Sequence, residues 1–356
     1  MDQTIRQLLI MAGANKASDV HLFSSVLPKF RVNGELIEVA NFEIGRSDEM
    51  SQKILSILNP EQIKKFELEK EIDFSLAVDE TRFRVNIYYQ KGEVAAALRV
   101  VPSEIRSFEQ LGLPKIVSEF VNLKQGFVLI TGPTGQGKST TVSSILNEIN
   151  RTRKTHIVTV EDPIEYIIKP EKSMISQREL GFDTLSFNSA LRSVLRQDPN
   201  VVFIGEMRDL ETIQSALTIA ETGHLVFSTL HTNSAAQTID RIIDVFPEGA
   251  KEQIRMQLST VISAIVSQRL VQTLDGGRLP AVEVLVANSA VKNNIREGKS
   301  FMIDNIIQTS ADAGMITLEG SLARLVNQGL VSEEVAMSHA LKPTEFTNKL
   351  RSIKGI

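Results

Sequence analysis

Short apolar runs alternate with amphipathic, helix-like segments along the second part of the chain. The strand-like runs are 127–130, 157–160, 201–204 and 224–229, and the helix-like segments are 140–149, 187–196, 210–221 and 235–245. Strands that are apolar throughout are typical of a parallel sheet that helices cover on both faces. The pattern therefore predicts an α/β fold, whose ligands bind beyond the carboxyl ends of the strands.

Residues 1–101 follow a different pattern, in which apolar and polar residues alternate along strand-like segments. The predicted strands are 20–22, 29–39, 74–78, 81–90 and 93–101, and the predicted helices are 4–12 and 47–58. Asn33-Gly34 within the second strand-like segment is a strong hairpin signal. This part of the chain is predicted to be an α+β domain with antiparallel strands.

The two patterns meet in a short segment between two prolines. Residues 102–115, bounded by Pro102 and Pro114, are predicted to be a linker, and 116–356 to be the second domain. From about residue 250 onward we expect mostly helices, with a hairpin around Gly276-Gly277.

A glycine-rich segment follows the first buried strand of the second domain. It reads Gly132-Pro-Thr-Gly-Gln-Gly-Lys138-Ser139, and a helical pattern begins directly after it. This is a phosphate-binding loop in its strand–loop–helix context. Glycines let backbone N–H groups close around phosphate oxygens, Lys138 supplies a charge for the β- and γ-phosphates, and the Ser139 hydroxyl can bind Mg²⁺. The loop predicts a site for a nucleoside triphosphate.

Composition limits the other classes of protein. The formal net charge is −4, so no overall basic field attracts nucleic acid. The chain contains no cysteine, which excludes disulfides and thiolate metal sites and suits a reducing compartment. No apolar run approaches the ~20 residues that a membrane-spanning helix requires, so any membrane contact is expected to be peripheral.

Two acidic motifs follow predicted strands. Glu161 begins the motif Glu-Asp-Pro-Ile-Glu after the strand 157–160, and it is a candidate to support Mg²⁺ or to orient a water molecule. A solvated acidic loop is the less favoured alternative for this motif when it is considered alone. Glu206 follows the strand 201–204 and is the candidate general base. Gly205 occupies the position where many nucleotidases have the Mg²⁺-binding aspartate.

Histidines and arginines supply weaker candidates. His224 and His231 bracket a predicted strand and could sense the γ-phosphate, although each could also be an ordinary polar residue at a strand end. Arg82, Arg84 and Arg99 lie on the last strands of the first domain, and Arg82 and Arg84 share a face because side chains alternate along a strand. An arginine that reaches nucleotide accelerates hydrolysis strongly, but a solvated strand face is an equally good interpretation.

Four motifs together resemble one family. They are the loop Gly-Pro-Thr-Gly-Gln-Gly-Lys-Ser-Thr, the acidic box Ile-Val-Thr-Val-Glu-Asp-Pro-Ile-Glu-Tyr, the motif Gly-Glu-Met-Arg-Asp-Leu-Glu-Thr and the histidine box Thr-Gly-His-Leu-Val-Phe-Ser-Thr-Leu-His-Thr. The chain is similar to the secretion-type hexameric ATPases of type II secretion and type IV pili. The glycine in place of the aspartate is that family's own pattern.

Within the family, the chain is most similar to the pilus-retraction subgroup. The segments Ser-Gln-Arg-Glu-Leu-Gly at 176–181 and Arg-Gln-Asp-Pro at 196–199 are close to that subgroup. Residues 290–297 resemble its signature helix Ala-Ile-Arg-Asn-Leu-Ile-Arg-Glu, with Asn294 in place of a leucine and mild changes at Val291 and Lys292. Assembly and secretion relatives usually carry a tetracysteine metal loop, which a chain without cysteine cannot form.

The resemblance implies a RecA-like P-loop NTPase core with an N-terminal PAS-like α+β domain. ATP would bind the loop residues Thr134, Gly135, Gln136, Gly137, Lys138, Ser139 and Thr140. Glu206 would activate water, Ser139 and Glu161 would hold Mg²⁺, partly through water, and His231 with His224 would report the phosphate state. Arg82, Arg84 or Arg99 would close over the phosphates.

The resemblance also implies partners and a location. It implies a homo-hexamer that works with a PilC-like inner-membrane platform protein and with other pilus ATPases. The ring would be cytoplasmic and peripherally associated with the inner membrane at the pilus base. It would withdraw pilin subunits, which gives pilus retraction and twitching motility.

Three alternatives stay open from the residues alone. An assembly or secretion motor, or an accessory PilU-like retraction ATPase, would use the same core. A nucleic-acid helicase or packaging motor shares the RecA-like core too, although the net charge of −4 argues against it. A scaffold that binds ATP without hydrolysing it is disfavoured by the intact Lys138 and Glu206.

Overall fold

The structure is a computed structural model that describes residues 1–355 except 25, 33, 41, 43–46, 80 and 103. The chain folds into two compact units, Met1–Glu104 and Ile105–Ile356. The smaller unit is an α+β domain built on an antiparallel sheet, and the larger is an α/β domain built on a mostly parallel one. None of the helices in the described ranges is long and apolar enough to cross a membrane.

The described residues of the smaller unit form six strands and three helices. They are α1 (Gln3–Ala14), β1 (Asp19–Phe23), β2 (Val26–Val32), β3 (Glu35–Glu38), α2 (Ser47–Leu55), α3 (Pro60–Glu69), β4 (Glu71–Val78), β5 (Thr81–Gln90) and β6 (Glu93–Val101). The strands form one sheet in the order β3-β2-β1-β6-β5-β4. The predicted hairpin between β2 and β3 is present as an antiparallel pair, although Asn33 of its turn lies outside the described residues.

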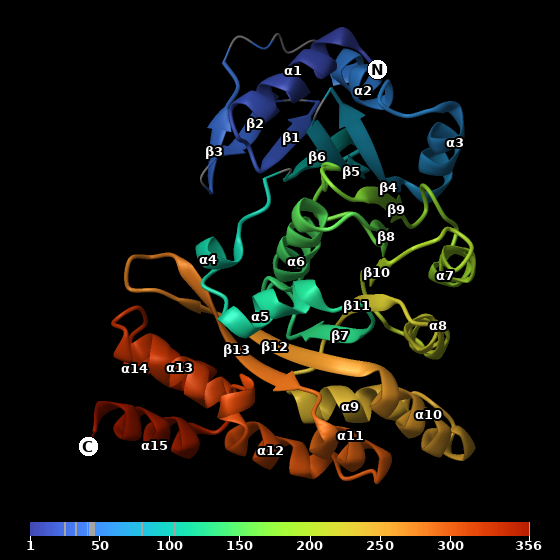
Figure 1. Cartoon of the computed structure of the whole chain (residues 1–356). Helices are drawn as coiled ribbons and strands as arrows, with labels where there is room; N and C mark the ends of the chain where they lie inside the picture. The colour runs from blue at the N-terminus through green and yellow to red at the C-terminus, as the bar shows by residue number, and fades with distance from the viewer. Residues whose placement is uncertain are drawn as a thin grey trace. The chain divides into compact units, whose positions relative to one another are not determined.

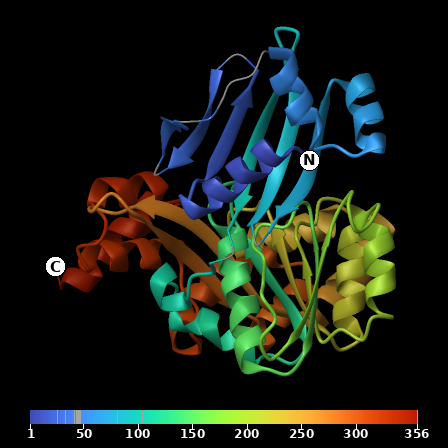
Figure 2. The ribbon, with the colours of Figure 1, turned by 90° about the horizontal axis from the view of Figure 1, so that it is seen from above.

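One face of this sheet carries the core of the smaller unit. Phe83, Val85 and Ile87 point from β5 to the same side and are fully buried against helix residues such as Leu8 and Leu9 of α1. Figure 2 shows α1 lying across that sheet. The polar residues that alternate with them on β5 therefore occupy the opposite face.

The helix α3 was not predicted from the sequence. The predicted helix 47–58 is shorter in the structure, where α2 ends at Leu55, and a further helix, α3, starts at Pro60. The Asn59 side chain accepts from the N–H of Gln62, and the Gln62 side chain accepts from the N–H of Asn59. This capping box, with proline in the first turn, is a helix start signal that outweighs the stop signal.

The larger unit contains seven strands between two layers of helices (Figure 1). Its first elements are α4 (Phe108–Leu111), α5 (Lys115–Glu119), η1 (Phe120–Asn122), β7 (Gly126–Thr131), α6 (Lys138–Thr152), β8 (His156–Glu161), β9 (Met174–Glu179), α7 (Phe187–Val194), β10 (Val201–Ile204), α8 (Leu210–Glu221), β11 (Leu225–Leu230), α9 (Ala235–Asp244) and α10 (Glu248–Val261). The remaining elements are β12 (Ile262–Gln272), β13 (Arg278–Val286), α11 (Ser289–Arg296), η2 (Ser300–Met302), α12 (Ile303–Thr309), η3 (Ala311–Ala313), α13 (Leu318–Asn327), α14 (Glu333–His339) and α15 (Pro343–Lys354).

The strand order β13-β12-β7-β11-β10-β8-β9 places the predicted strands at the centre of the sheet. Strands β7, β11, β10 and β8 pair in parallel, and every residue on them is buried. Buried side chains of α8, α9 and α10 pack on one face of the sheet, and those of α6 pack on the other. The parallel α/β fold predicted from the apolar runs is confirmed.

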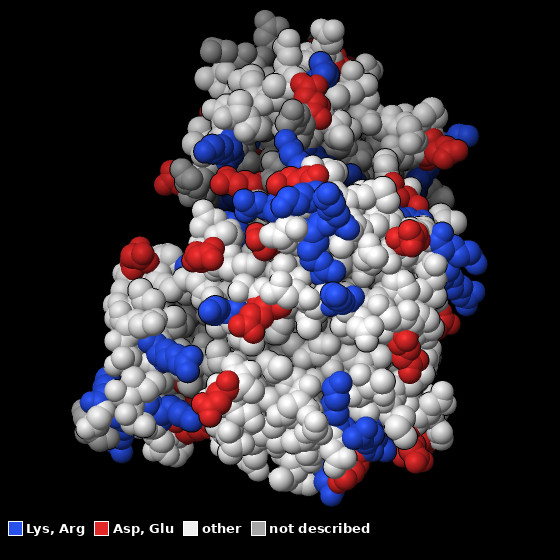
Figure 3. Space-filling model, viewed as in Figure 1, with Lys and Arg blue, Asp and Glu red and all other residues white. Residues whose placement is uncertain are grey.

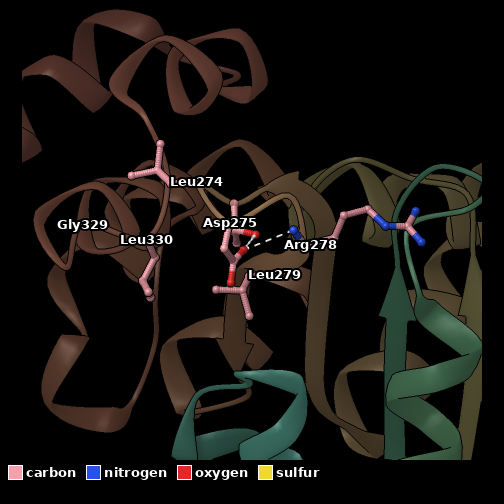
Figure 4. A pocket seen from close by; sticks show the side chains of 8 residues that line it. Leu274, Asp275, Arg278, Leu279, Gly329 and Leu330 are labelled. Atoms are coloured by element: carbon pink, nitrogen blue, oxygen red, sulfur yellow. Dashed lines mark hydrogen bonds between the residues drawn. The ribbon is translucent and has the colours of Figure 1, made fainter.

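The region beyond residue 250 contains more strand than expected. The predicted hairpin around Gly276-Gly277 is present, but its two arms are nine and eleven residues long, and β12 also pairs in parallel with β7. At its tip, the Asp275 carboxylate accepts from the Gly277 N–H, and the Leu274 N–H donates to the Leu330 carbonyl. Leu274, Leu279 and Leu330 line a cavity of about 270 Å³ there (Figure 4).

The segment predicted to be a linker contains structure of its own. Phe108 of α4 is buried against the core on the α6 side of the sheet, and Ile105 and Leu113 pack against the same cluster. Packing from Ile105 onward assigns this part of the segment to the larger unit.

On the face drawn in Figure 3, basic and acidic side chains are interspersed, in keeping with 39 basic and 43 acidic residues.

A buried carboxyl group connects β13 to the start of α9. Glu283 is 8% exposed, and its Oε1 accepts from the Ala235 N–H at 2.7 Å. Burial raises the pKa of Glu283 to about 7, the Ala235 N–H opposes the rise, and the neighbouring Asp304 and Glu319 add to it. The charged form is therefore unfavourable in the folded state at neutral pH.

We predict that Glu283→Gln stabilises the protein in alkaline but not in acidic solution. Folding raises this pKa from 4.5 to about 7. Below pH 4.5 the carboxyl group is neutral in both states and does not reduce the free energy of unfolding. As the pH rises through 7 the group ionises in the folded state, and the free energy of unfolding falls. The loss reaches at most about 3 kcal/mol. Glutamine keeps the acceptor without the charge, so its melting temperature should exceed that of wild type at pH 8 and match it near pH 4.5.

Glu252→Gln, at an exposed position on α10, is the matched control and should melt like wild type at both pH values. If the difference in melting temperature between Glu283→Gln and wild type were the same at pH 4.5 and pH 8, the carboxyl group would not titrate as described.

Candidate nucleotide-hydrolysis site

The glycine-rich loop connects the buried strand β7 to helix α6 and closely follows the neighbouring strand β12. A Cβ at Gly132, where φ is +139°, would lie 2.3 Å from the carbonyl oxygen of Gln268. Only glycine fits such a backbone approach. The loop ends at Gly137, from which α6 starts at Lys138 without a side-chain cap. The first N–H groups of α6 are therefore available to an anion, which the helix dipole also favours.

Lys138 lies inside the loop rather than in solvent. It is 8% exposed, and its Nζ donates to the carbonyl oxygens of Gly132 at 2.6 Å and Pro133 at 3.0 Å. Burial lowers the pKa of Lys138, and the charge of Glu206 partly opposes that effect. The ammonium group is thus held at the loop, on the same side as Glu206, where phosphate oxygens are expected.

Four strand ends bring the predicted catalytic groups to one edge of the sheet. Because β7, β11, β10 and β8 run in parallel, their carboxyl ends meet at that edge. The loop follows β7, His231 follows β11, Glu206 is the second residue after β10, and Glu161 is the last residue of β8. The spatial grouping expected from the motifs is therefore present for these groups.

His231 joins the loop to Glu206. Its Nδ1 lies 3.2 Å from Thr134 Oγ1 in the loop, and its Nε2 lies 3.1 Å from Glu206 Oε1. The second oxygen of Glu206 accepts from Arg208 at 3.0 Å. An imidazole between a loop hydroxyl and a carboxylate is placed to change partners when phosphate arrives or leaves.

Glu206 is ionised at neutral pH. Burial raises its pKa, but the hydrogen bond from Arg208 and the proximity of His231 outweigh burial, so that the pKa of Glu206 is below its usual value. A carboxylate in this form can accept a proton from a water molecule. Its side chain is 24% exposed, so that water can reach it.

Gly205 has a steric reason to replace aspartate. A Cβ at this position would lie 3.2 Å from the Glu161 Cα and 3.3 Å from the Val160 carbonyl oxygen. The Gly205 N–H donates to that same carbonyl at 2.8 Å, so the two strand ends are in direct contact. A larger residue would push β10 away from β8 and separate Glu206 from Glu161.

Glu161 is buried and already hydrogen-bonded. It is 5% exposed, its Oε1 accepts from Thr159 Oγ1 at 2.7 Å and from Gln177 Nε2 at 3.1 Å, and its Oε2 accepts from the Glu165 N–H at 3.4 Å. Burial raises the pKa of Glu161 to about 7, although these hydrogen bonds lower it. With three donors in place, the carboxylate suits a water-mediated contact to Mg²⁺ better than direct coordination.

The hydroxyl of Ser139 is the other candidate for the cation. Ser139 is the second residue of α6 and is half-buried, whereas its neighbour Thr140 bonds the Tyr166 hydroxyl at 2.9 Å. Among the residues that the structure describes, no three histidine or acidic side chains gather as a metal-binding group. Oxygen ligands and few protein contacts fit Mg²⁺, which usually keeps several waters and binds nucleotide phosphates.

His224 lies away from these groups within the larger unit. It precedes the first residue of β11, whereas His231 follows the last, so the strand separates them by about 20 Å. Its Nδ1 is near Thr222 Oγ1 at 3.0 Å and the Ile219 carbonyl at 3.1 Å, at the end of α8. The expectation that His224 works beside His231 does not hold within one subunit, because the two residues lie at opposite edges of the sheet.

The three predicted arginines share one face of the sheet in the smaller unit. Arg82 and Arg84 alternate with buried residues on β5, and Arg99 of β6 is directly opposite Arg84. Arg99 Nε donates to Asp19 Oδ1 at 3.0 Å, and its side chain is 68% exposed. The predicted common face of Arg82 and Arg84 is therefore present, and their action on nucleotide stays a prediction.

Several residues that support the site lacked a sequence signal. Gln177 of β9 donates to Glu161 and to the Tyr166 carbonyl, and its Oε1 accepts from the Ile168 N–H at 2.8 Å. Gln268 of β12 contacts the glycine-rich loop. Gln177 stands in a polar strand and Gln268 between Ser267 and Arg269, so neither is distinct in the sequence, although buried polar residues are usually hydrogen-bonded within the fold.

Comparisons with known proteins agree with this geometry. Residues 1–316 match the family described as Type II/IV secretion system protein. The chain is 43% identical over 343 residues to the "Type IV pilus retractation ATPase PilT" of Pseudomonas aeruginosa, covering 96% of this chain and 99% of that protein. It is 47% identical over 315 residues to the "Twitching motility protein" of Neisseria gonorrhoeae, covering 88% and 84%.

A solved structure is similar over nearly the whole chain. "Crystal Structure of the Pilus Retraction Motor PilT and Bound ADP" matches with a TM-score of 0.89 and 44% identity, and it covers 98% of this chain and 100% of that one. The α/β unit is accordingly a RecA-like core, and the chain is an ATPase that binds nucleotide.

We predict that Glu206→Gln retains ATP binding and loses most of its turnover, by about 10²-fold or more. Glutamine preserves the size and the contact with Arg208, but it cannot accept a proton from water. The measurements are ATP affinity with a fluorescent analogue and phosphate release at saturating ATP. Asp244→Asn, which removes an exposed carboxylate on α9, is the matched control. Turnover at the wild-type rate would exclude Glu206 as the base.

Proposed function

The chain belongs to the family of type II/IV secretion system proteins, and from this we propose that it is an ATP-hydrolysing motor that powers type IV pilus retraction. The observation that carries the proposal is the contact chain from Thr134 through His231 to Glu206. It links a phosphate-binding loop to a general base, which a protein that only holds nucleotide would not need. The relatives named above are the support for pilus retraction as the work done.

The chemical step follows from the placement of three side chains. Lys138 faces the β- and γ-phosphates and stabilises the charge that develops on them. Glu206 accepts a proton as the water oxygen bonds to the γ-phosphorus, the bond between the γ-phosphorus and the β–γ bridging oxygen breaks, and ADP leaves with that oxygen. Mg²⁺, held by Ser139 and through water by Glu161, would neutralise phosphate charge. His231 exchanges a bond to Glu206 for a bond to phosphate and so registers whether phosphate is present.

Work requires that this local change reaches the smaller unit. We infer that Arg82, Arg84 and Arg99, which share one face of the sheet, bind phosphate oxygens of a nucleotide and stabilise a closed arrangement. Loss of the γ-phosphate removes the charge that they bind, and the arrangement opens. The chain between Val101 and Ile105 then acts as the hinge.

The proposed assembly is a homo-hexameric ring. Six sites in a ring would convert successive domain motions into rotation or traction on a PilC-like platform protein in the inner membrane. The ring would act on the cytoplasmic side at the pilus base, with peripheral membrane contact and in company with other pilus ATPases. Within a ring, His224 would be free to serve a neighbouring subunit rather than its own site.

The helix α11 supports retraction rather than assembly. Its Val291 and Ile295 are buried, while Asn293 and Arg296 are exposed. Asn294, the least conservative of the departures from the retraction signature, is half-buried, and its side chain donates to the Ala290 carbonyl of its own helix at 2.8 Å. The asparagine side chain is therefore hydrogen-bonded within its own helix, and the exposed side chains of the signature remain in place.

The test is deletion of the gene in the source organism. We predict excess surface pili and loss of twitching, because pili continue to be assembled but are not withdrawn. Electron microscopy counts the pili, and colony expansion under agar measures twitching. Complementation with wild type should reverse both effects, whereas complementation with Glu206→Gln should not. Cells without pili would contradict retraction and indicate an assembly motor.

A further inference from the structure

A buried glutamine on β12 contacts the phosphate-binding loop from behind. Gln268 is 3% exposed, and its Nε2 donates to the Gln136 carbonyl at 2.7 Å. Its Oε1 accepts from Thr141 Oγ1 of α6 at 2.8 Å. One side chain therefore bonds both the loop and the first turn of the helix that follows it.

The loop returns a bond to the same strand. The Gln136 side chain accepts, through its Oε1, from the Leu270 N–H at 2.6 Å. At the end of β7, just before the loop, the buried hydroxyl groups of Thr131 and Ser267 lie 2.8 Å apart and are hydrogen-bonded. Strand β12 thus holds the loop at its beginning and at its tip, and neither contact involves the groups that face phosphate.

The bond to the Gln136 carbonyl fixes the direction of the next N–H. The peptide between Gln136 and Gly137 is planar and trans, so its C=O and N–H point in opposite directions. With the carbonyl directed to Gln268, the Gly137 N–H points away from β12, toward the side where the loop encloses phosphate. Glycine at 137, with φ of +79°, has enough backbone freedom for this peptide to flip if nothing holds it.

We propose that Gln268 is a positioning residue that prevents this flip and keeps the Gly137 N–H available to the β-phosphate. A flipped peptide would present a carbonyl oxygen to the phosphate instead of a donor. The inference rests on the proposed ATPase function, since it concerns the same loop. It adds a residue outside the four sequence motifs, on a strand that carries no part of them.

Gln268→Glu is the sharpest test, because its effect on binding depends on pH. An ionised carboxylate repels the Gln136 carbonyl and favours the flip, whereas a protonated carboxyl can donate and restore the native bond. We expect ADP to bind about 10- to 100-fold more weakly than to wild type at pH 8. The ratio of the variant's dissociation constant to that of wild type should fall toward one at pH 5.5. Protonation of ADP affects its binding to both proteins equally, so it cancels in this ratio.

Two companion variants make the result decisive. Gln268→Met keeps the size without a donor, so its weakening should be about tenfold and independent of pH, and it replaces the glutamate variant if that chain does not fold. Gln272→Glu adds the same charge at an exposed position of the same strand and should bind ADP like wild type. Melting curves for each variant separate lost binding from lost folding.

The outcomes distinguish this inference from the proposed function. Wild type that fails to bind ADP would contradict the ATPase function itself. Wild-type binding together with full affinity in folded Gln268→Met, or in folded Gln268→Glu at pH 8, would overturn only the role of Gln268. A loss in Gln268→Glu that stays unchanged between pH 8 and pH 5.5 would also overturn it, because packing rather than the donor would then be responsible.

Discussion

The parallel pairing of β7, β11, β10 and β8 is the constraint on which the site depends. Parallel strands end at one edge, so residues more than 70 positions apart in the chain, such as Thr134 and Glu206, come within reach of one histidine. The apolar side chains of these strands are buried on both faces, which fixes the register and therefore the height of each catalytic group. The catalytic groups are therefore positioned by the packing of apolar side chains that take no part in the reaction.

The edge is then stiffened by two polar side chains, of which Gln268 is buried and Gln177 is half-buried. Gln177 holds Glu161 from the outer strand β9, and Gln268 holds the loop from β12 on the other side of β7. Buried amides of this kind are costly unless every bond is made, and here donor and acceptor of both side chains are used. The site thus has a rigid support on both flanks, while His231 between them keeps two exchangeable contacts.

The sequence was most informative where one physical effect dominates. Apolar runs predicted the central strands to within one or two residues, and the motifs identified the loop, Glu206, Glu161 and His231. It was least informative where tertiary contacts decide: Met174–Glu179 is a polar edge strand without an apolar run, and Gln268 has no local signature. The role of His224 stays a prediction: the strand β11 separates it from His231 within one subunit, which the two motif histidines at its ends already implied.

The central claim is that the phosphate state at this edge controls the arrangement of the smaller unit. The absence of native cysteine allows one spin label at Lys64 on α3 and one at Gln253 on α10, both exposed, in labelled subunits diluted with unlabelled chain. Pulsed electron paramagnetic resonance then measures the distance between them in the Glu206→Gln background. The mechanism predicts distance distributions that differ by several ångströms between ATP and ADP. Identical distributions with ATP, with ADP and without nucleotide would contradict it.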